Sequence, residues 1–367
     1  MLWRSVFRPL LFCLPAETAH ELSMHVFALS VRVPGISHCV ERACRVDDQR
    51  LNAKYFGLNF ENPVGLAAGF DKNGLWFPAL QRLGFGFVEI GTLTSVEQTG
   101  NPKPRLFRLS RDQALINRMG FNNRGSEWAA ARLSRQKISG IVGINIGKSK
   151  TTELAQAAGD YRKSFDRLFP FASYFTINVS SPNTQGLRDL QNRRDLNLII
   201  SELSAANQRL SNSLNIAAKP ILLKIAPDLS DEQIDEMAEL ALENGLDGII
   251  ATNTTVNRHG LKTDPQKVER IGTGGLSGAP LTERSRTVVS KLYARLGQRI
   301  PIVGCGGIMT PHDAWLMINA GASLIQVYSG FVYGGPRFAY AINRYLLRCL
   351  DKAGVQSISD CVGRNWT

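Results

Sequence analysis

The sequence predicts an α/β fold, a closed (β/α)8 TIM barrel with a small N-terminal helical extension. Three observations predict it: eight short apolar runs recur after residue 50, helical patterns separate them, and polar side chains follow the runs. Apolar runs that alternate with amphipathic stretches are typical of a parallel sheet covered by helices. Eight such units in about 300 residues favour a closed barrel over an open doubly wound sheet. No G-x-G-x-x-G motif follows the first run, which argues further against an open dinucleotide-binding sheet.

The first 31 residues predict a pair of helices. The first has apolar side chains on one side, with Arg4 and Arg8 beside them, a pattern typical of a segment in a membrane interface. Pro9 is expected to divide it into short pieces. The second runs from Glu17 to Val31 and stops before Pro34. The apolar residues are Trp3, Phe7, Leu10 and Leu11 in the first helix and Ala19, Leu22, Val26 and Leu29 in the second. Packing of the pair on its own domain is the alternative to membrane contact.

Each apolar run is expected to form one barrel strand. The clearest helical patterns between the runs are Asp231–Asn244 and Pro311–Ala320. The runs are Pro63–Gly69, Phe87–Thr92, Ile141–Gly147, Tyr174–Ser180, Ile221–Ala226, Gly248–Asn253, Ile302–Gly306 and Leu324–Ser329.

Polar residues occur at the carboxyl end of every predicted strand, where barrels of this kind place their catalytic groups. Lys224 is the most informative, because an unpaired ammonium in the apolar ILLKIAP segment would be costly if it faced the helices. It is expected to point into the barrel mouth, either as a Schiff-base nucleophile or as a fixed positive charge against an electron-rich cofactor. A lysine that snorkels past the rim is the structural alternative. Asn145 and Asn178 are similarly either ligand contacts or members of a satisfied polar layer.

Glycine-rich segments follow the last strands. Gly304–Ile308 (GCGGI) and Tyr328–Gly330 (YSG) lie where many barrels bind a phosphate through backbone N–H groups. Gly274–Gly278 (GGLSG) suits the same chemistry, because glycine lets the main chain approach the phosphate oxygens. Plain tight turns are the alternative, but the position favours a phosphate-bearing cofactor.

The loop Asn178–Thr184 (NVSSPNT) is the expected reaction centre. Pro182 favours an extended backbone at Ser181 and stiffens the loop, so the Ser181 hydroxyl would be held in one place. No G-x-S-x-G elbow surrounds it, which argues against hydrolase chemistry. Taken alone, Ser181 is better explained by a loop-capping role.

Composition excludes several other classes. The 43 Lys and Arg residues exceed the 31 Asp and Glu residues and give a net charge of +12, but they form no run, and no nucleic-acid-binding motif is present. Nucleic acid is therefore not expected as a partner. The six cysteines contain no C-x-x-C pair and the five histidines no ligand set, so neither disulfides nor a metal site is expected. The apolar run Leu10–Leu14 is shorter than the h-region of about 7–15 residues in a cleaved signal peptide.

Eleven motifs along the chain resemble those of the dihydroorotate dehydrogenase family. The serine in NVSSPNT and the N-terminal extension resemble its quinone-dependent, membrane-associated class 2, since class 1 carries a cysteine as the base and lacks the extension. The motifs are GLAAGFDKNG (65–74), EIGT (89–92), KPRLFRL (103–109), NRMGFNN (117–123), GINIGK (143–148), NVSSPNT (178–184), KIAPDLS (224–230), ATNTT (251–255), GGLSG (274–278), GCGGI (304–308) and QVYSG (326–330). Cys305 departs from the apolar residue expected between those glycines, but a small buried thiol should substitute there without altering the phosphate contacts.

The resemblance implies FMN as cofactor and the oxidation of (S)-dihydroorotate to orotate, the fourth step of UMP biosynthesis, with a quinone as electron acceptor. Ser181 would be the catalytic base, with hydride passing to flavin N5. The implied FMN contacts are Ala68, Gly69, Phe70, Asp71, Lys72, Thr92, Asn145, Asn178, Lys224, Thr252, Gly278, Gly307, Tyr328 and Ser329. The implied substrate contacts are Lys72, Asn117, Arg118, Met119, Gly120, Phe121, Asn178, Asn183, Asn253 and Thr254.

The resemblance also implies a quinone site and a peripheral location. His20, Arg105 and Tyr328 would lie near the quinone head, reached through the N-terminal helices. The expected division is an extension over 1–45, an FMN-binding barrel over 46–350 and a tail over 351–367. The chain is expected to be a monomer on the cytoplasmic face of the inner membrane. Two competing functions are a Schiff-base aldolase that uses Lys224 and a non-catalytic ligand-binding or membrane-docking barrel.

Overall fold

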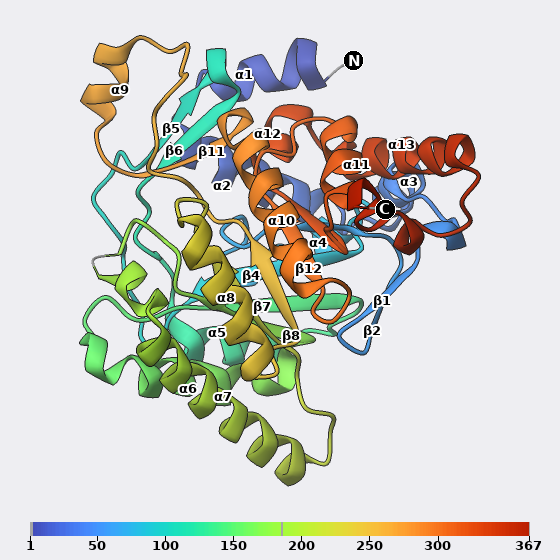
Figure 1. The fold of residues 1–367 in the computed structure, drawn as a ribbon. Helices are drawn as coiled ribbons and strands as arrows, with labels where there is room; N and C mark the ends of the chain where they lie inside the picture. Colours follow the sequence, from blue (N-terminus) through green and yellow to red (C-terminus); the bar gives the residue numbers. More distant parts are fainter. Residues whose placement is uncertain (1–2, 185, 367) are drawn as a thin grey trace.

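A closed barrel of eight parallel strands forms the centre of the molecule (Figure 1). The computed structural model describes residues 3–184 and 186–366. Each predicted run coincides with one barrel strand to within a few residues, so the predicted (β/α)8 barrel is confirmed. The strands pair in sequence order, and β13 closes the ring on β3. They are β3 (Val64–Leu66), β4 (Phe87–Leu93), β7 (Ile141–Ile146), β8 (Tyr174–Asn178), β9 (Ile221–Ile225), β10 (Gly248–Ala251), β12 (Ile302–Cys305) and β13 (Leu324–Val327).

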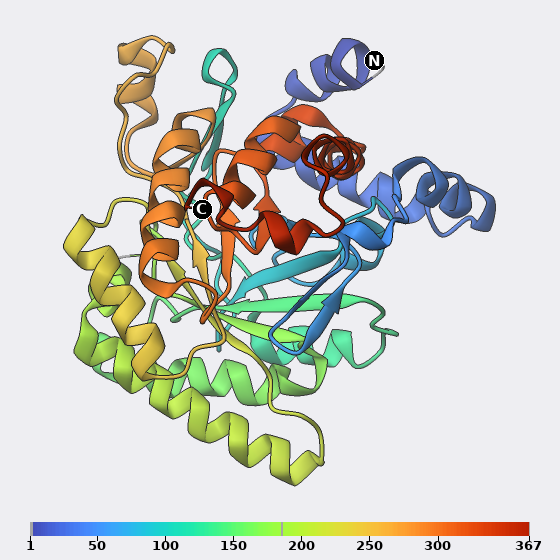
Figure 2. The same ribbon diagram turned by 45° about the vertical axis from the view of Figure 1, so that its right-hand side comes forward.

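A helix follows each barrel strand, and these helices form the outer layer seen in Figure 2. Two of them start at capping boxes, with Ser230 before α8 and Thr310 before α11. Each of these two predicted helices ends one residue earlier than expected. The helices are α4 (Phe77–Gln81), α5 (Gly125–Leu133), α6 (Ala157–Leu168), α7 (Arg193–Leu214), α8 (Asp231–Glu243), α10 (Thr282–Leu296), α11 (Pro311–Asn319) and α13 (Phe338–Ala353), with α9 (Pro265–Ile271) and α12 (Ser329–Gly334) in the connections after β10 and β13.

Side chains inside the barrel form layers of different chemistry. The amino-terminal end is filled by aromatic rings: Phe60, from the hairpin β1 (Ala53–Tyr55) and β2 (Leu58–Phe60), packs edge-on against Phe87 at 5.3 Å. Glycine is required beside this layer, because a Cβ at Gly65 would lie 2.2 Å from the Phe87 ring. Because side chains alternate along a strand, Glu89 also points inward, one layer nearer the carboxyl ends. A buried polar layer that contains Glu89 therefore separates the aromatic layer of Phe60 and Phe87 from the open end of the barrel.

A three-stranded antiparallel sheet lies at the carboxyl ends of the barrel strands. It consists of β5 (Leu106–Leu109), β6 (Ala114–Asn117) and β11 (Gly275–Gly278). In β11 and β6, Gly275 pairs with Asn117, so this sheet joins distant parts of the chain. Figures 1 and 2 show β5, β6 and α9 projecting on the side of the barrel that also carries α1. The sequence did not predict this sheet.

The N-terminal extension contains three α-helices in place of the expected pair. A π-helical turn, Trp3–Phe7, precedes α1 (Arg8–Phe12), and α2 (Ala16–Ser30) is shifted by one residue from the predicted pattern. The helix α2 ends before Pro34, as predicted, but Pro34 then lies in the first turn of a further helix, α3 (Pro34–Cys44), where its missing N–H costs no hydrogen bond. No helix in the described ranges is long and apolar enough to span a membrane.

Candidate active site

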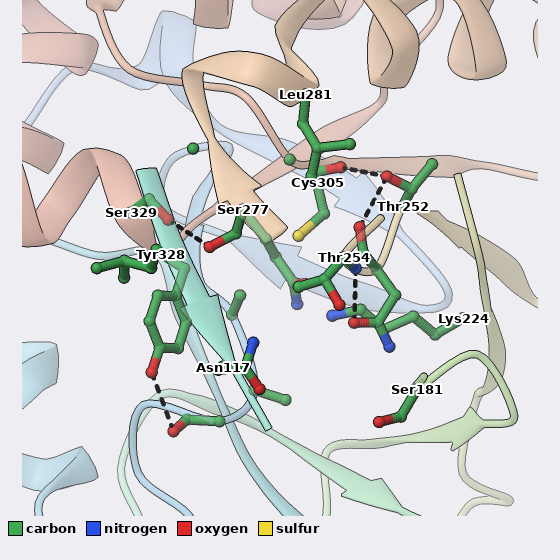
Figure 3. A pocket seen from close by; sticks show the side chains of 18 of the residues that line it. Asn117, Ser181, Lys224, Thr252, Thr254, Ser277, Leu281, Cys305, Tyr328 and Ser329 are labelled. Atoms are coloured by element: carbon green, nitrogen blue, oxygen red, sulfur yellow. Dashed lines mark hydrogen bonds between the residues drawn. The ribbon is translucent and has the colours of Figure 1, made fainter. Parts of the chain in front are cut away.

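A pocket opens at the carboxyl ends of the barrel strands, where the sequence predicted the functional groups (Figure 3). It encloses about 1140 Å³, including the part that opens to solvent. Most of the predicted site residues line it. Those that do are Ala68, Gly69, Lys72, Thr92, Asn117, Met119, Gly120, Phe121, Asn178, Ser181, Asn183, Lys224, Thr252, Asn253, Thr254, Gly278, Gly307, Tyr328 and Ser329.

Four of the predicted cofactor and substrate contacts do not line the pocket, and two of them, Phe70 and Asp71, hold the loop after β3 in place. The fully buried Asp71 carboxylate accepts hydrogen bonds from the backbone N–H groups of Leu75, Trp76 and Phe77 at 2.6–2.8 Å, which fixes the start of α4. Phe70 packs edge-on against Tyr328, with ring centroids 5.5 Å apart. These two residues therefore shape the loop around Lys72, while Lys72 itself lines the pocket.

Arg118 and Asn145 also lie behind the pocket surface. The Arg118 guanidinium stacks 4.8 Å from the Phe107 ring centroid and donates to the Ile271 carbonyl, so it ties the β5–β6 hairpin to α9. Asn145 is fully buried, and its side chain hydrogen-bonds with Glu89, Thr92 and Asn178. The contacts predicted for these residues remain predictions.

Ser181 stands in the pocket wall on the loop after β8 (Figure 3). Its Oγ accepts a hydrogen bond from the Asn183 N–H at 3.3 Å. Arg188 holds the same loop, since its Nε donates to the Ser180 carbonyl at 3.1 Å and its Nη1 pairs with Asp228 at 2.8 Å. The Thr184 Oγ1 is buried with no hydrogen-bond partner among the described residues. Ser181 is therefore carried on a loop held by Arg188, and Thr184, three residues further along that loop, has a buried hydroxyl that could bond a water molecule.

Two pairs of asparagines from separate segments line the same pocket. Asn183 Nδ2 donates to Asn117 Oδ1 at 2.9 Å, and Asn253 Nδ2 donates to Asn178 Oδ1 at 3.3 Å. Each amide both donates and accepts hydrogen bonds. This arrangement suits a small planar ligand whose edge carries N–H and C=O groups.

Two lysines supply positive charge. Lys72 Nζ donates to the Gly69 carbonyl at 2.9 Å, and burial lowers the pKa of Lys72 to about 8, although Glu17 partly opposes that shift. Lys224, beside Asn178 in the neighbouring strand, is 5% exposed and forms no ion pair among the described residues. An anionic or electron-rich ligand would compensate both charges.

The side chains of Ser277 and Ser329 lie on the side of the pocket away from Ser181 (Figure 3). The Oγ atoms of Ser277 and Ser329 lie 2.9 Å apart. Gly307 adopts φ +73°, and a Cβ there would lie 2.2 Å from Thr282 Cα, so only glycine fits this close approach. This corner has the chemistry of a phosphate site. Sequence reasoning missed Ser277, although the GGLSG motif contains it.

Gln326 is a second missed residue, and it lines the pocket from β13. Its side chain is 1% exposed, and its Oε1 has no hydrogen-bond partner within the described ranges. A buried acceptor without a donor is costly. A bound ligand that donates a hydrogen bond there would remove this cost. The signals in the sequence were a glutamine in the apolar strand LIQVYS and its place at the start of the QVYSG motif.

The three predicted quinone-site residues lie around α2. The partly buried His20 ring packs edge-on against Phe70 at 4.6 Å, and Phe70 in turn contacts Tyr328. Burial, reinforced by the charge of Lys72, lowers the pKa of His20 to about 3, so this imidazole is neutral at pH 7. Burial raises the pKa of Tyr328 to about 12. His20 and Tyr328 thus flank one ring that connects the N-terminal helices to the pocket.

Arg105 is held by the carboxylate of Glu17, for which the sequence predicted no role beyond the start of a helix. Its Nη2 and Nε bond the two Glu17 oxygens at 2.7 and 3.2 Å, and its Nη1 donates to the Thr99 and Asn101 carbonyls. Burial alone would raise the pKa of Glu17, but the hydrogen bonds and charge of Arg105 lower it. This ion pair fastens α2 to the loop before β5. In residues 3–184 and 186–366, no group of three or more His, Cys, Asp or Glu residues is arranged to hold a metal ion.

Comparisons with known proteins agree with this geometry. The family described as dihydroorotate dehydrogenase matches residues 50–350. A protein of Thermobifida fusca named dihydroorotate dehydrogenase (quinone) is 47% identical, over 99% of this chain and 96% of its own. A protein of Chloroflexus aurantiacus with the same name is 50% identical, over 95% of this chain and 96% of its own. The crystal structure of DHODH from Eimeria tenella in complex with ferulenol is 38% identical and has a TM-score of 0.85, covering 95% of each chain. This chain belongs to the dihydroorotate dehydrogenase family.

Proposed function

We propose that this enzyme oxidises dihydroorotate to orotate in pyrimidine biosynthesis and passes the electrons to a quinone. Membership of the family supports the reaction, and the name of its relatives supports the acceptor. The observation that carries the proposal is the pocket itself. It brings Ser181, two asparagine pairs, the buried Lys224 and the partly buried Lys72 together at one end of the barrel.

A flavin is the cofactor that this chemistry implies, and we propose that it is FMN. The residues present fit such a group: within the described part of the chain, the buried Lys224 has no acidic partner and the buried Gln326 Oε1 has no donor. Ser277, Ser329 and Gly307 suit its phosphate. When bound, the flavin supplies the acceptor for the hydride that leaves C6 of dihydroorotate.

The remaining groups act on the substrate. Lys72 would attract the substrate carboxylate, and the Asn117–Asn183 and Asn178–Asn253 pairs would hold the ring through its N–H and C=O groups. Positioning of this kind accounts for much of the catalysis in such reactions. Ser181 would take the proton from C5, and water beside the unpartnered Thr184 Oγ1 would carry that proton away.

The purified holoprotein is expected to be yellow and to bleach when dihydroorotate is added without oxygen. A quinone analogue should restore the colour, whereas fumarate and NAD should not. An anaerobic visible spectrum records all three results and tests cofactor, substrate and acceptor together. A protein whose bound flavin is not bleached by dihydroorotate would overturn the proposed substrate.

The KM for dihydroorotate is expected to rise as the pH increases through about 8. Burial lowers the pKa of Lys72 to about 8, so its ammonium holds the substrate carboxylate below this pH and loses its proton above it. Turnover at saturating substrate should change less, because the substrate is then bound. Steady-state kinetics from pH 7 to 10 measure the effect. Lys72→Met should show a high KM without this pH dependence, and a flat wild-type KM would contradict the role of Lys72.

We also propose that the N-terminal helices lie on the membrane. An apolar surface on α1 and α2 faces solvent: the exposed fractions of Leu10, Val26 and Leu29 are 64%, 60% and 65%. Arg32, Arg132 and Arg135 line two shallow pockets beside α2, which would suit an anionic leaflet. Of the four apolar residues predicted for this helix, Ala19 is buried and Leu22, Val26 and Leu29 are exposed. Packing of α2 on the barrel domain therefore leaves most of its apolar side uncovered.

The proposed quinone route runs along α2 to the pocket. His20, Tyr328 and Phe70 would form its inner end, and Arg105 would be fixed beside it by Glu17. We propose the division into an extension (1–45), a catalytic barrel (46–350) and a tail (351–367), in a monomer bound peripherally to the cytoplasmic face of the inner membrane. The tail packs on the barrel helices, since the Gly363 N–H donates to the Ile318 carbonyl at 3.1 Å.

A further inference from the structure

A buried carboxylate lies beneath the active-site pocket. Glu89, on β4, is fully buried inside the barrel and does not line the pocket. Its oxygens accept hydrogen bonds from four side chains on three other strands. The donors are Asn145 Nδ2 at 2.8 Å, Gln326 Nε2 at 2.8 Å, Tyr174 Oη at 3.0 Å and Thr176 Oγ1 at 3.1 Å. Burial and the neighbouring Glu89 raise the pKa of Tyr174 well above its ordinary value, so Tyr174 remains a donor.

This carboxylate fixes the direction of a chain of amides that leads into the pocket. Asn145 must turn its NH2 group toward Glu89, so its Oδ1 is directed toward the pocket-lining Asn178 and accepts from Asn178 Nδ2 at 3.1 Å. Asn178 then presents its own Oδ1 to Asn253 Nδ2 at 3.3 Å. Reversal of any one amide would place donor against donor or acceptor against acceptor. The three amides therefore have one consistent orientation, which starts at Glu89.

A second branch passes through Gln326. Because its Nε2 donates to Glu89, its Oε1 is directed away from that carboxylate and is the buried acceptor without a partner. Thr92 fits the same scheme, since its Oγ1 donates to Asn145 Oδ1 at 2.6 Å. One carboxylate thus decides which pocket residues offer donors and which offer acceptors.

We propose that Glu89 is a positioning residue that sets the hydrogen-bonding polarity of the flavin and substrate site through Asn145 and Gln326. The proposal rests on the proposed function, since the ligands are those of that reaction. It differs from a purely structural role, in which Glu89 would only satisfy polar groups of the barrel core. A structural role predicts altered stability, whereas a positioning role predicts altered ligand affinity in a folded protein.

The test is Glu89→Gln, which keeps the size but replaces one acceptor oxygen with an NH2 donor. At least one of the facing amides must then reverse or lose its partner. We expect the Kd of the holoprotein for orotate, measured by the shift in flavin absorption, to rise about tenfold, the scale of one hydrogen bond. The KM for dihydroorotate should rise with it, more than kcat falls. The Kd of the apoprotein for FMN, measured by quenching of flavin fluorescence, should also rise.

Two further variants separate orientation from structure. Thr176→Val removes one donor to Glu89 but requires no amide to reverse, so it should lower the melting temperature and leave both affinities near the wild-type values. Glu89→Gln combined with Asn145→Asp restores a donor-to-acceptor contact and again offers Asn178 an acceptor. This double variant should recover much of the orotate affinity.

Each of these measurements either supports or overturns the positioning role of Glu89. Unchanged orotate and FMN affinities in Glu89→Gln, or equal losses in Thr176→Val, would overturn the proposal. If Glu89→Gln does not fold, the double variant carries the test: it should fold and bind orotate, and its failure to do so would overturn the orientation argument. Wild-type protein that binds no orotate would instead contradict the proposed function.

Discussion

Replacement of Ser181 by alanine is expected to slow flavin reduction by dihydroorotate by about 10²–10⁴-fold at neutral pH, the usual contribution of a general base. The Ser181 side chain lies in the pocket wall, and only its hydroxyl is lost in this variant. Anaerobic stopped-flow absorption, which follows the bleaching of the flavin, measures the step directly.

The same variant should leave ligand binding largely intact. Ser181 Oγ accepts from the Asn183 N–H, a long contact of 3.3 Å that contributes little to the shape of the loop. The Kd for orotate should therefore stay close to the wild-type value. Ser181→Cys is the matched control, because a thiolate can accept the same proton, and it should retain more activity than alanine. Near-normal flavin reduction in Ser181→Ala at neutral pH would exclude Ser181 as the base.

The sequence predicted the barrel and most of the pocket because both depend on local patterns. Apolar runs mark the strands, and the carboxyl ends of parallel strands meet at one face of a barrel. The sequence alone therefore placed Lys224 and Asn178 at the same face, where they lie in neighbouring strands. The pairing of β6 with β11 could not be predicted, because Asn117 and Gly275 are far apart in sequence. Neither segment shows the alternation of apolar and polar residues that marks a long strand. The helix α3 was missed because Pro34 reads equally as a stop and as a first-turn residue.

The missed polar residues share one physical reason. Glu89, Gln326 and Glu17 each carry out their role through a partner that is distant in sequence. Glu89 lies in the EIGT motif, yet nothing in the sequence shows that Asn145, Tyr174 and Gln326 donate to it. Hydrogen-bond direction is a property of the assembled barrel, whereas a motif indicates only which residue types are present.

Deletion of residues 1–33 is expected to abolish quinone turnover and to spare the reduction of the flavin by dihydroorotate. The deletion ends before α3 and removes α1 and α2 together with His20 and Glu17. The dihydroorotate pocket is lined by residues 67–330, none of which is removed. Flavin reduction in single turnover and steady-state reduction of a quinone analogue measure the two steps separately. Unchanged quinone kinetics would contradict a role of the N-terminal helices in quinone access.

Point variants in the full chain separate membrane binding from stability. The deletion leaves Arg105 without its carboxylate and uncovers Phe70, so lower stability could by itself reduce turnover. Val26→Asp with Leu29→Asp changes only exposed side chains and adds negative charge beside Arg32. We expect this pair to abolish co-sedimentation with anionic vesicles and turnover of vesicle-bound quinone, since each charge of the wrong sign costs about 1 kcal/mol near such a surface. Turnover of a soluble quinone analogue should persist, because His20 and Tyr328 are untouched. Normal vesicle binding by this variant would show that the membrane contacts another face of the protein.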